Sequence, residues 1–225
     1  MSSSLLLIGA TGSLGRLLVH ELERRGVPHR ALVRTPDREN DLGARPLVEL
    51  VPGDLREPSS IDAALDGVDR VFLLSSPDRD QIRLQGNVIE AAERTGRPLH
   101  VVQVSALGAV PEDTPLQLAR WHAVTEAQLR SAELPFTILR PQFLMQNFLR
   151  VASSIQTENM LCGSFDEARL PLVDGRDVAA VAATVLTTDG HHGCTYNLTA
   201  PQALSYTEVA ATFAALVGRP MRYIE

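Results

Sequence analysis

Three glycines near the amino terminus, Gly9, Gly12 and Gly15, follow a continuous apolar run and precede a helix with periodic apolar residues. Gly9 permits a sharp turn, Gly12 lets the backbone approach a phosphate, and Gly15 lets the helix pack closely on its strand. The first N–H groups of that helix can bind an anion. This pattern predicts a dinucleotide pyrophosphate site, and the alternative is a glycine turn that binds no nucleotide. The expected contact residues are Gly9, Thr11, Gly12, Ser13, Leu14 and Gly15.

A basic residue ends the second expected strand, which covers residues 29–34. Arg34 follows Gly15 by 19 positions, where an NAD-binding chain usually has a carboxylate for the ribose 2′-hydroxyl. An arginine there can pair with a 2′-phosphate instead. We therefore expect NADP(H) to be preferred over NAD(H), with Arg38 as a second basic group. The alternative is that Arg34 is a solvated surface residue.

Polar or small residues also follow the third, fourth and fifth expected strands. They are Asp54 with Leu55, Ser75 with Ser76, and Ser105. In a doubly wound sheet, ligands bind beyond the carboxyl ends of the strands. Asp54 could accept a hydrogen bond from the adenine amine while Leu55 covers the ring, although a plain Gly-Asp turn explains them equally well. The serines are expected to bond a ribose of the cofactor.

Composition limits the classes of partner. The chain has 225 residues, a formal net charge of −6 and no basic run, which argues against nucleic acid and anionic membranes as partners. No apolar run has transmembrane length, and no basic segment of a signal peptide precedes the first strand. Cys162 and Cys194 form no motif and suit a reducing cytoplasm. The pair His191-His192 lacks further ligands at metal-binding spacing, so no metal site is expected.

Strands alternate with helices through the first two thirds of the chain. Expected strands lie at 29–34, 47–51, 71–74, 100–104 and 136–140, and expected helices at 59–65, 79–94 and 116–131. This alternation predicts an α/β fold with a doubly wound, mostly parallel Rossmann sheet. We expect residues 1–150 to form the dinucleotide-binding core, and 151–225 to return strands to it and form a small lobe. Expected helix N-caps are Ser59 or Ser60, and Ser205 or Thr207.

The chain resembles the NmrA-like branch of the atypical short-chain dehydrogenase/reductases, which includes NAD(P)H-dependent quinone reductases and azoreductases. The segments that carry the resemblance are 9–15, 33–34, 53–55, 104–106, 121–126, 134–143, 146–147, 173–179 and 196–199. The resemblance implies cofactor contacts from the glycine loop, from Arg34, from the serines after the fourth strand, and from the turn Pro141, Gln142 and Phe143. The residues that follow this turn are expected to line a substrate pocket, or equally to pack under the lobe. They are Met145, Gln146 and Asn147.

The chain departs from the family in its catalytic residues. Typical short-chain dehydrogenases protonate a carbonyl with a Tyr-x-x-x-Lys pair, but all 21 basic side chains here are arginine. The helix that would carry this pair has His122 and Glu126, one turn apart. His122 is expected to donate a proton near neutral pH, with Glu126 orienting it. The alternative is a partly exposed pair on the helix surface.

The sequence thus predicts a cytoplasmic, NADPH-dependent oxidoreductase that reduces a quinone-like or other electrophilic small molecule by hydride transfer. Quinone reduction needs no strong general acid, so the missing tyrosine and lysine do not exclude it. One alternative is a non-catalytic NADP(H)-sensing regulator, and another is a biosynthetic enzyme that performs a cyclisation or dehydration. A homodimer or a partner protein is left open. Family members usually continue past this chain's last residue, which implies a truncated or pared-down substrate lobe.

Overall fold

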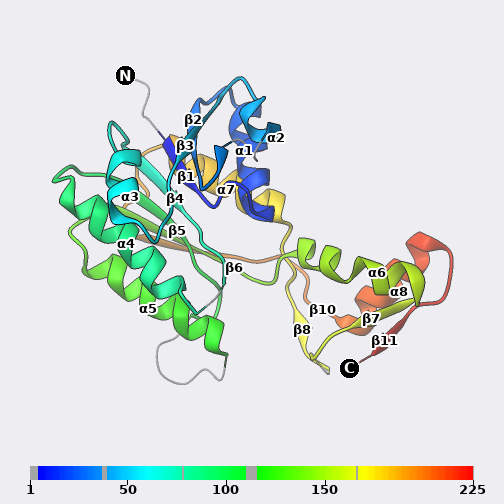
Figure 1. The fold of residues 1–225 in the computed structure, drawn as a ribbon. Coiled ribbons are helices and arrows are strands. Elements are labelled where there is room, and N and C mark those ends of the chain that lie inside the picture. Colours follow the sequence, from blue (N-terminus) through cyan, green and yellow to red (C-terminus); the bar gives the residue numbers. More distant parts are fainter. Residues whose placement is uncertain (1–4, 37–39, 78, 110–115, 166, 225) are drawn as a thin grey trace. The chain divides into compact units, whose positions relative to one another are not determined.

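The computed structural model describes residues 5–36, 40–77, 79–109, 116–165 and 167–224 (Figure 1). Arg38, the expected second basic group, lies outside these residues. The chain forms two compact units. The first contains Met1–Arg140 and Arg176–Asn197, and the second contains Pro141–Gly175 and Leu198–Glu225. The sequence predicts a single boundary at residue 150, whereas the chain crosses between the units three times. It leaves the first unit after Arg140, returns at Arg176 and leaves again after Asn197.

A seven-stranded sheet with the order β3-β2-β1-β4-β5-β6-β9 forms the centre of the first unit. The pairs β1–β2, β2–β3, β1–β4, β4–β5 and β5–β6 are all parallel. The strand order reverses between β1 and β4, and ligands of doubly wound sheets bind beyond such a point. The expected α/β fold class is confirmed. The strands are β1 (Leu5–Ile8), β2 (His29–Val33), β3 (Val48–Pro52), β4 (Arg70–Leu73), β5 (His100–Val104), β6 (Phe136–Pro141) and β9 (Cys194–Leu198).

Helices cover both faces of this sheet, with α3, α4 and α5 on one face and α1 and α7 on the other (Figure 1). All four residues of β1 are buried, as a strand covered on both sides requires. Leu6 and Ile8 pack in the core cluster that α3, α4 and α5 share, whereas Leu5 and Leu7 point to the other side. The helices are α1 (Ser13–Arg24), α2 (Asn40–Gly43), α3 (Pro58–Ala64), α4 (Gln81–Arg94), α5 (Gln117–Ser131) and α7 (Gly175–Thr187).

The N-cap of α3 differs from the one predicted from the sequence, whereas the N-cap of the last helix agrees with the prediction. The N-cap of α3 is Glu57, and Pro58 opens the helix, so the expected cap at Ser59 or Ser60 is wrong. A proline fits this first position because its missing N–H would have no partner in the helix. Ser205 does cap the last helix, α8 (Tyr206–Val217), and forms a capping box with Glu208.

The second unit is small and rich in aromatic side chains. Its core contains six rings whose neighbouring centroids lie 4.6–6.4 Å apart. Such ring packing lets a short segment bury much apolar area with few residues. These rings belong to Phe143, Phe148, Phe165, Tyr206, Phe213 and Tyr223. The remaining elements are η2 (Met145–Val151), α6 (Ala152–Thr157), β7 (Met160–Cys162) paired with β11 (Arg222–Ile224), and β8 (Arg169–Leu170) paired with β10 (Leu204–Ser205).

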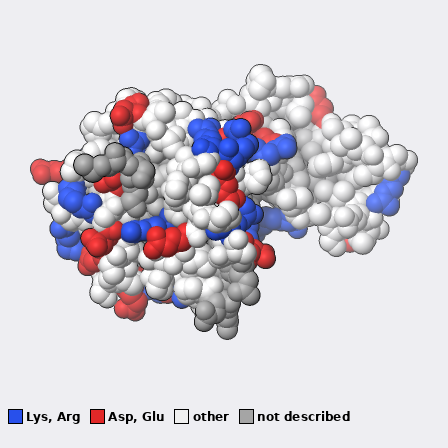
Figure 2. Space-filling view, turned by 90° about the horizontal axis from the view of Figure 1, so that it is seen from above, with Lys and Arg blue, Asp and Glu red and all other residues white. Residues whose placement is uncertain are grey.

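Charged side chains do not gather into a surface of one sign on the face shown in Figure 2, where arginines and carboxylates are interspersed. None of the helices in the described part of the chain is long and apolar enough to cross a membrane.

Candidate functional site

The glycine loop connects β1 to α1, and two of its glycines are required by the protein itself. Gly9 has a φ of +88°, which L side chains rarely adopt, and a Cβ there would overlap the carbonyl oxygen of Leu74. A Cβ on Gly15 would overlap the carbonyl oxygen of Gly9, because the first turn of α1 lies directly against the loop. Both positions therefore need glycine whether or not a ligand binds.

Gly12 is different, because nothing in the described part of the chain requires it to be glycine. It is the N-cap of α1, and the nearest atom to an added Cβ would be the Gly9 carbonyl oxygen at 3.4 Å. Thr11, Gly12 and Ser13 are exposed, and none of the side chains that the structure describes caps the N–H groups of the first turn. This leaves open space beside backbone N–H groups at a helix N-terminus, the arrangement that binds a pyrophosphate.

Arg34 follows β2 and leaves the sheet at the same edge as the glycine loop, since Ile8 of β1 lies opposite Leu32 of β2. Its side chain is exposed and makes no hydrogen bond or ion pair with any residue that the structure describes. The guanidinium is therefore free to pair with an anion such as a phosphate.

The turn after β3 is stabilised by contacts within the protein. The Asp54 carboxylate accepts a hydrogen bond from the Arg56 N–H at 2.9 Å, and the Arg56 guanidinium lies 3.7 Å away. The Leu55 side chain packs against the main core, and its carbonyl oxygen accepts from Asn87 at 2.7 Å. These contacts account for the turn, and contact of Asp54 and Leu55 with adenine stays a prediction.

Two serines at the ends of β4 and β5 lie on neighbouring strands, because Leu73 and Gln103, two positions earlier, are opposite each other. The oxygen of Ser75 accepts a hydrogen bond from Gln85 of α4 at 3.1 Å. Ser105 is buried, and its hydroxyl donates to Glu126 of α5 at 2.5 Å. Ser76 is exposed. The two strand ends thus have hydroxyl groups that buried side chains orient.

The sequence predicts that Glu126 orients His122, but the hydrogen-bond partner of the His122 ring in the described part of the chain is a different residue. The His122 Nδ1 lies 3.1 Å from the side-chain nitrogen of Gln81 at the start of α4. The ring is only 8% exposed, and this burial lowers the pKa of His122 to about 4. The imidazole is therefore neutral at neutral pH. The expected surface pair is also wrong, because both side chains lie inside the protein.

Glu126 is held by arginines. Its side chain is 4% exposed, and the Arg140 guanidinium donates to both carboxylate oxygens, at 2.8 and 2.6 Å. Arg130, one helical turn further, lies 3.7 Å away. Arg140, Gln81 and Gln85 are site residues that the sequence did not predict. Polar residues four apart on a largely buried face of α4 were the available signal for the glutamines.

The other expected contact residues lie in the second unit. Phe143 packs in the aromatic core, and the Gln146 side chain bonds to Asp174 at 2.8 Å and to the Gly175 N–H at 2.7 Å. Met145 is 40% exposed. Pro141 is buried, whereas Gln142 and Asn147 are partly buried. A role of these residues toward cofactor or substrate stays a prediction.

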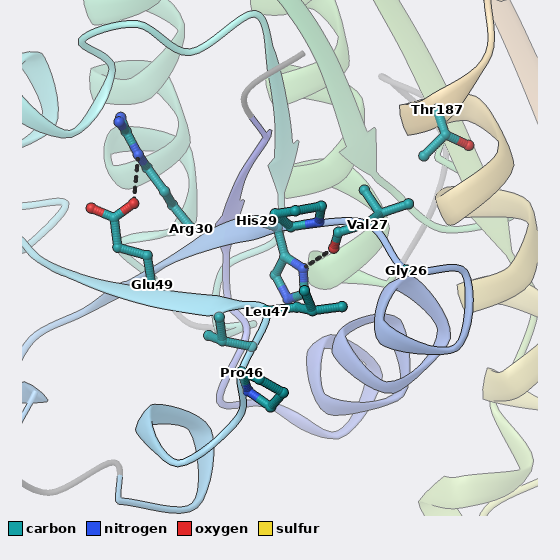
Figure 3. A pocket seen from close by; sticks show the side chains of 10 residues that line it. Gly26, Val27, His29, Arg30, Pro46, Leu47, Glu49 and Thr187 are labelled. Atoms are coloured by element: carbon teal, nitrogen blue, oxygen red, sulfur yellow. Dashed lines mark hydrogen bonds and ion pairs between the residues drawn. The ribbon is translucent and has the colours of Figure 1, made fainter. Parts of the chain in front are cut away.

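One hollow of about 610 Å³ lies at the opposite edge of the sheet, around the starts of β2 and β3 (Figure 3). Its charged lining is paired within the protein, because Arg30 binds Glu49 at 3.3 Å. His29 contacts the Val27 carbonyl oxygen at 3.0 Å, and burial lowers its pKa. None of the expected site residues lines this hollow, so it is separate from the glycine loop.

Comparison with known proteins gives a family match and several relatives. A family model described as NAD(P)H-binding matches residues 9–189. The NAD(P)H azoreductase of Xenophilus azovorans is 39% identical over 220 residues, which are 98% of this chain and 76% of the azoreductase.

Solved structures of two reductases are also similar. The triphenylmethane reductase of Citrobacter sp., complexed with NADP(H), has a TM-score of 0.86 and 28% identity. The NADPH-dependent quinone oxidoreductase of Escherichia coli, complexed with NADPH, has a TM-score of 0.87 and 29% identity. Each comparison covers 98% of this chain and 78% of the solved chain.

Proposed function

Because this chain belongs to the NAD(P)H-binding family, in the NmrA-like branch that its sequence resembles, we propose that it is an NADPH-dependent reductase of quinone-like and dye-like electrophiles. The observation that carries this proposal is the open space at Gly12, beside the N–H groups in the first turn of α1, which no side chain in the described part of the chain caps. The names of the relatives, an azoreductase, a quinone oxidoreductase and a triphenylmethane reductase, support the substrate class.

The preference for NADPH rests on Arg34. The exposed guanidinium leaves the sheet beside the glycine loop, where the ribose next to the pyrophosphate would bring its 2′-phosphate. A charged hydrogen bond of this kind stabilises binding by about 1.5–3 kcal/mol. The complexes of the two similar reductases with NADP(H) and NADPH support the same preference.

The side chains on α5 suit a reduction that needs little acid catalysis. Bound NADPH would supply the hydride, and an electron-poor quinone or azo bond accepts it without prior protonation by a strong acid. His122 is neutral at neutral pH, so it could offer a hydrogen bond through Nε2 while Gln81 bonds Nδ1. Protons can then come from water. Such a reductase would work in the cytoplasm, where thiols such as Cys162 stay reduced.

The test is a turnover assay with the purified chain, NADPH and a panel of quinones, azo dyes and triphenylmethane dyes. We expect loss of NADPH absorbance only when an acceptor is present, together with formation of the reduced acceptor. Binding of NADPH without oxidation by any acceptor would contradict a reductase. That result would favour the non-catalytic NADP(H)-sensing regulator instead.

A further inference from the structure

The two serines at the ends of β4 and β5 have opposite hydrogen-bonding capacity. The Ser75 oxygen accepts from the Gln85 amide at 3.1 Å, so its own O–H remains to be donated. Ser105 donates to Glu126 at 2.5 Å, so its single proton is already used. The two hydroxyl groups therefore present different atoms at the cofactor-binding edge of the sheet.

Glu126 determines the direction of its hydrogen bond with Ser105. Arg140 donates to both carboxylate oxygens of Glu126, so both oxygens act as acceptors, and the hydroxyl that contacts one of them has to be the donor. A buried carboxylate is also costly unless its oxygens are well satisfied. The Ser105 hydroxyl supplies one of the bonds that satisfy it. The lone pairs of Ser105 are then all that the residue can offer to any other group.

We propose that Glu126 and Arg140 are positioning residues that fix the Ser105 hydroxyl as an acceptor, so that Ser105 binds an N–H or O–H donor of NADPH. The inference rests on the proposed NADPH site. The donors that the nicotinamide end of the cofactor carries are the carboxamide N–H and the ribose hydroxyls. The same geometry prevents Ser105 from polarising a carbonyl oxygen of the substrate, since that would require the proton given to Glu126.

A double-mutant cycle on NADPH affinity tests this directly. We expect Ser105→Ala to raise the Kd about fivefold, the effect of one neutral hydrogen bond. Glu126→Gln should raise it more, about twentyfold, because the new amide would donate to Ser105 and turn the hydroxyl proton toward a cofactor donor. In the double variant that repulsion is gone, so the Kd should return to about that of Ser105→Ala.

Matched controls use exposed side chains at the end of the same helix. Ser131→Ala and Glu133→Gln repeat the two chemical changes away from the strand ends and should leave the Kd within about twofold. Thermal melts of every variant check folding. A second ligand, the reduced acetylpyridine analogue of NADPH, lacks the carboxamide N–H. If the Ser105→Ala effect disappears with it, the bound donor is the carboxamide; if the effect persists, the donor is a ribose hydroxyl.

The proposal is overturned if the losses of the two single variants multiply in the double variant, or if Ser105→Ala leaves NADPH affinity unchanged. If Glu126→Gln does not fold, the comparison of Ser105→Ala with Ser105→Thr, which keeps the hydroxyl, decides alone. The cycle measures binding, so it is independent of turnover. Failure with every acceptor would refute the proposed reductase, whereas an ordinary turnover with a multiplicative cycle would refute only the role of Glu126.

Discussion

The glycine loop and the buried polar side chains of helix α5 both lie near the carboxyl ends of strands of one sheet, but the two regions are built in opposite ways. The loop presents backbone, and its key positions are defined by the lack of a side chain. Helix α5 presents buried polar side chains, His122 and Glu126, which partners from α4, β5 and β6 hold in place. A site made of backbone depends on the spacing of glycines in one short segment. A site made of side chains depends on partners that the fold brings together from distant parts of the sequence.

This contrast extends to what each region needs from a ligand. In the loop, Gly9 and Gly15 are required by packing within the protein, and only Gly12 has a space that the protein leaves open. On α5, the Glu126 charge is already neutralised by Arg140. The loop is thus prepared for an anion, while the buried carboxylate of Glu126 on α5 already has its partner.

The largest effect is expected where packing alone demands glycine. Gly15→Ala places a methyl group on the Gly9 carbonyl oxygen, so the first turn of α1 must move. We expect a loss of about 3 kcal/mol in the free energy of unfolding. This would lower the melting temperature by about 6–12 °C and weaken NADPH binding as well. An unchanged melting temperature would contradict the conclusion that the loop and α1 are too closely packed to admit a methyl group at position 15.

Acid should destabilise the folded protein through the buried His122 of α5. The folded pKa of His122 is about 4 because of burial, below its ordinary value of 6.5, so the unfolded chain binds the proton more readily. Stability is full above about pH 6.5 and falls as the pH approaches 4, by about 3 kcal/mol for this ring. His100, whose pKa burial also lowers to about 4, adds to the same trend.

The measurement is urea unfolding across this pH range. In His122→Gln, an amide replaces the titrating ring beside Gln81, and stability should fall less steeply with acid than in the unmodified chain. Identical slopes would show that His122 is not the buried neutral ring described above.

Arg34 lies at the same edge of the sheet as the glycine loop. It is the side chain there that would distinguish NADPH from NADH. Arg34→Ala should raise the Kd for NADPH about thirtyfold and that for NADH less than about twofold. The matched control is Arg30→Ala on β2, the strand that precedes Arg34, because the Arg30 guanidinium is bonded to Glu49 and Arg30 lines the hollow at the other edge. Equal losses for both cofactors with Arg34→Ala would remove the basis for preferring NADPH.

The same contrast explains what the sequence could predict. The glycine loop, and the alternation of strands and helices that indicates a parallel sheet, depend on residues close in the chain, so spacing and periodicity predict them. The partners of His122 and Glu126 were not predictable in this way. Gln81 is 41 positions from His122, and Arg140 reaches Glu126 only because β6 lies beside β5. The N-cap of α3 was missed for a local reason, because Pro58 was not weighed as a helix start.

The most direct test of the account is NADPH titration of Gly12→Ala beside the unmodified chain, with thermal melts of both. The added methyl group meets no protein atom closer than 3.4 Å, so the melting temperature should stay within about 2 °C. It does occupy the space beside the N–H groups of α1, so the Kd for NADPH should rise about tenfold. An unchanged Kd in a folded Gly12→Ala variant would contradict the assignment of this loop as the pyrophosphate site.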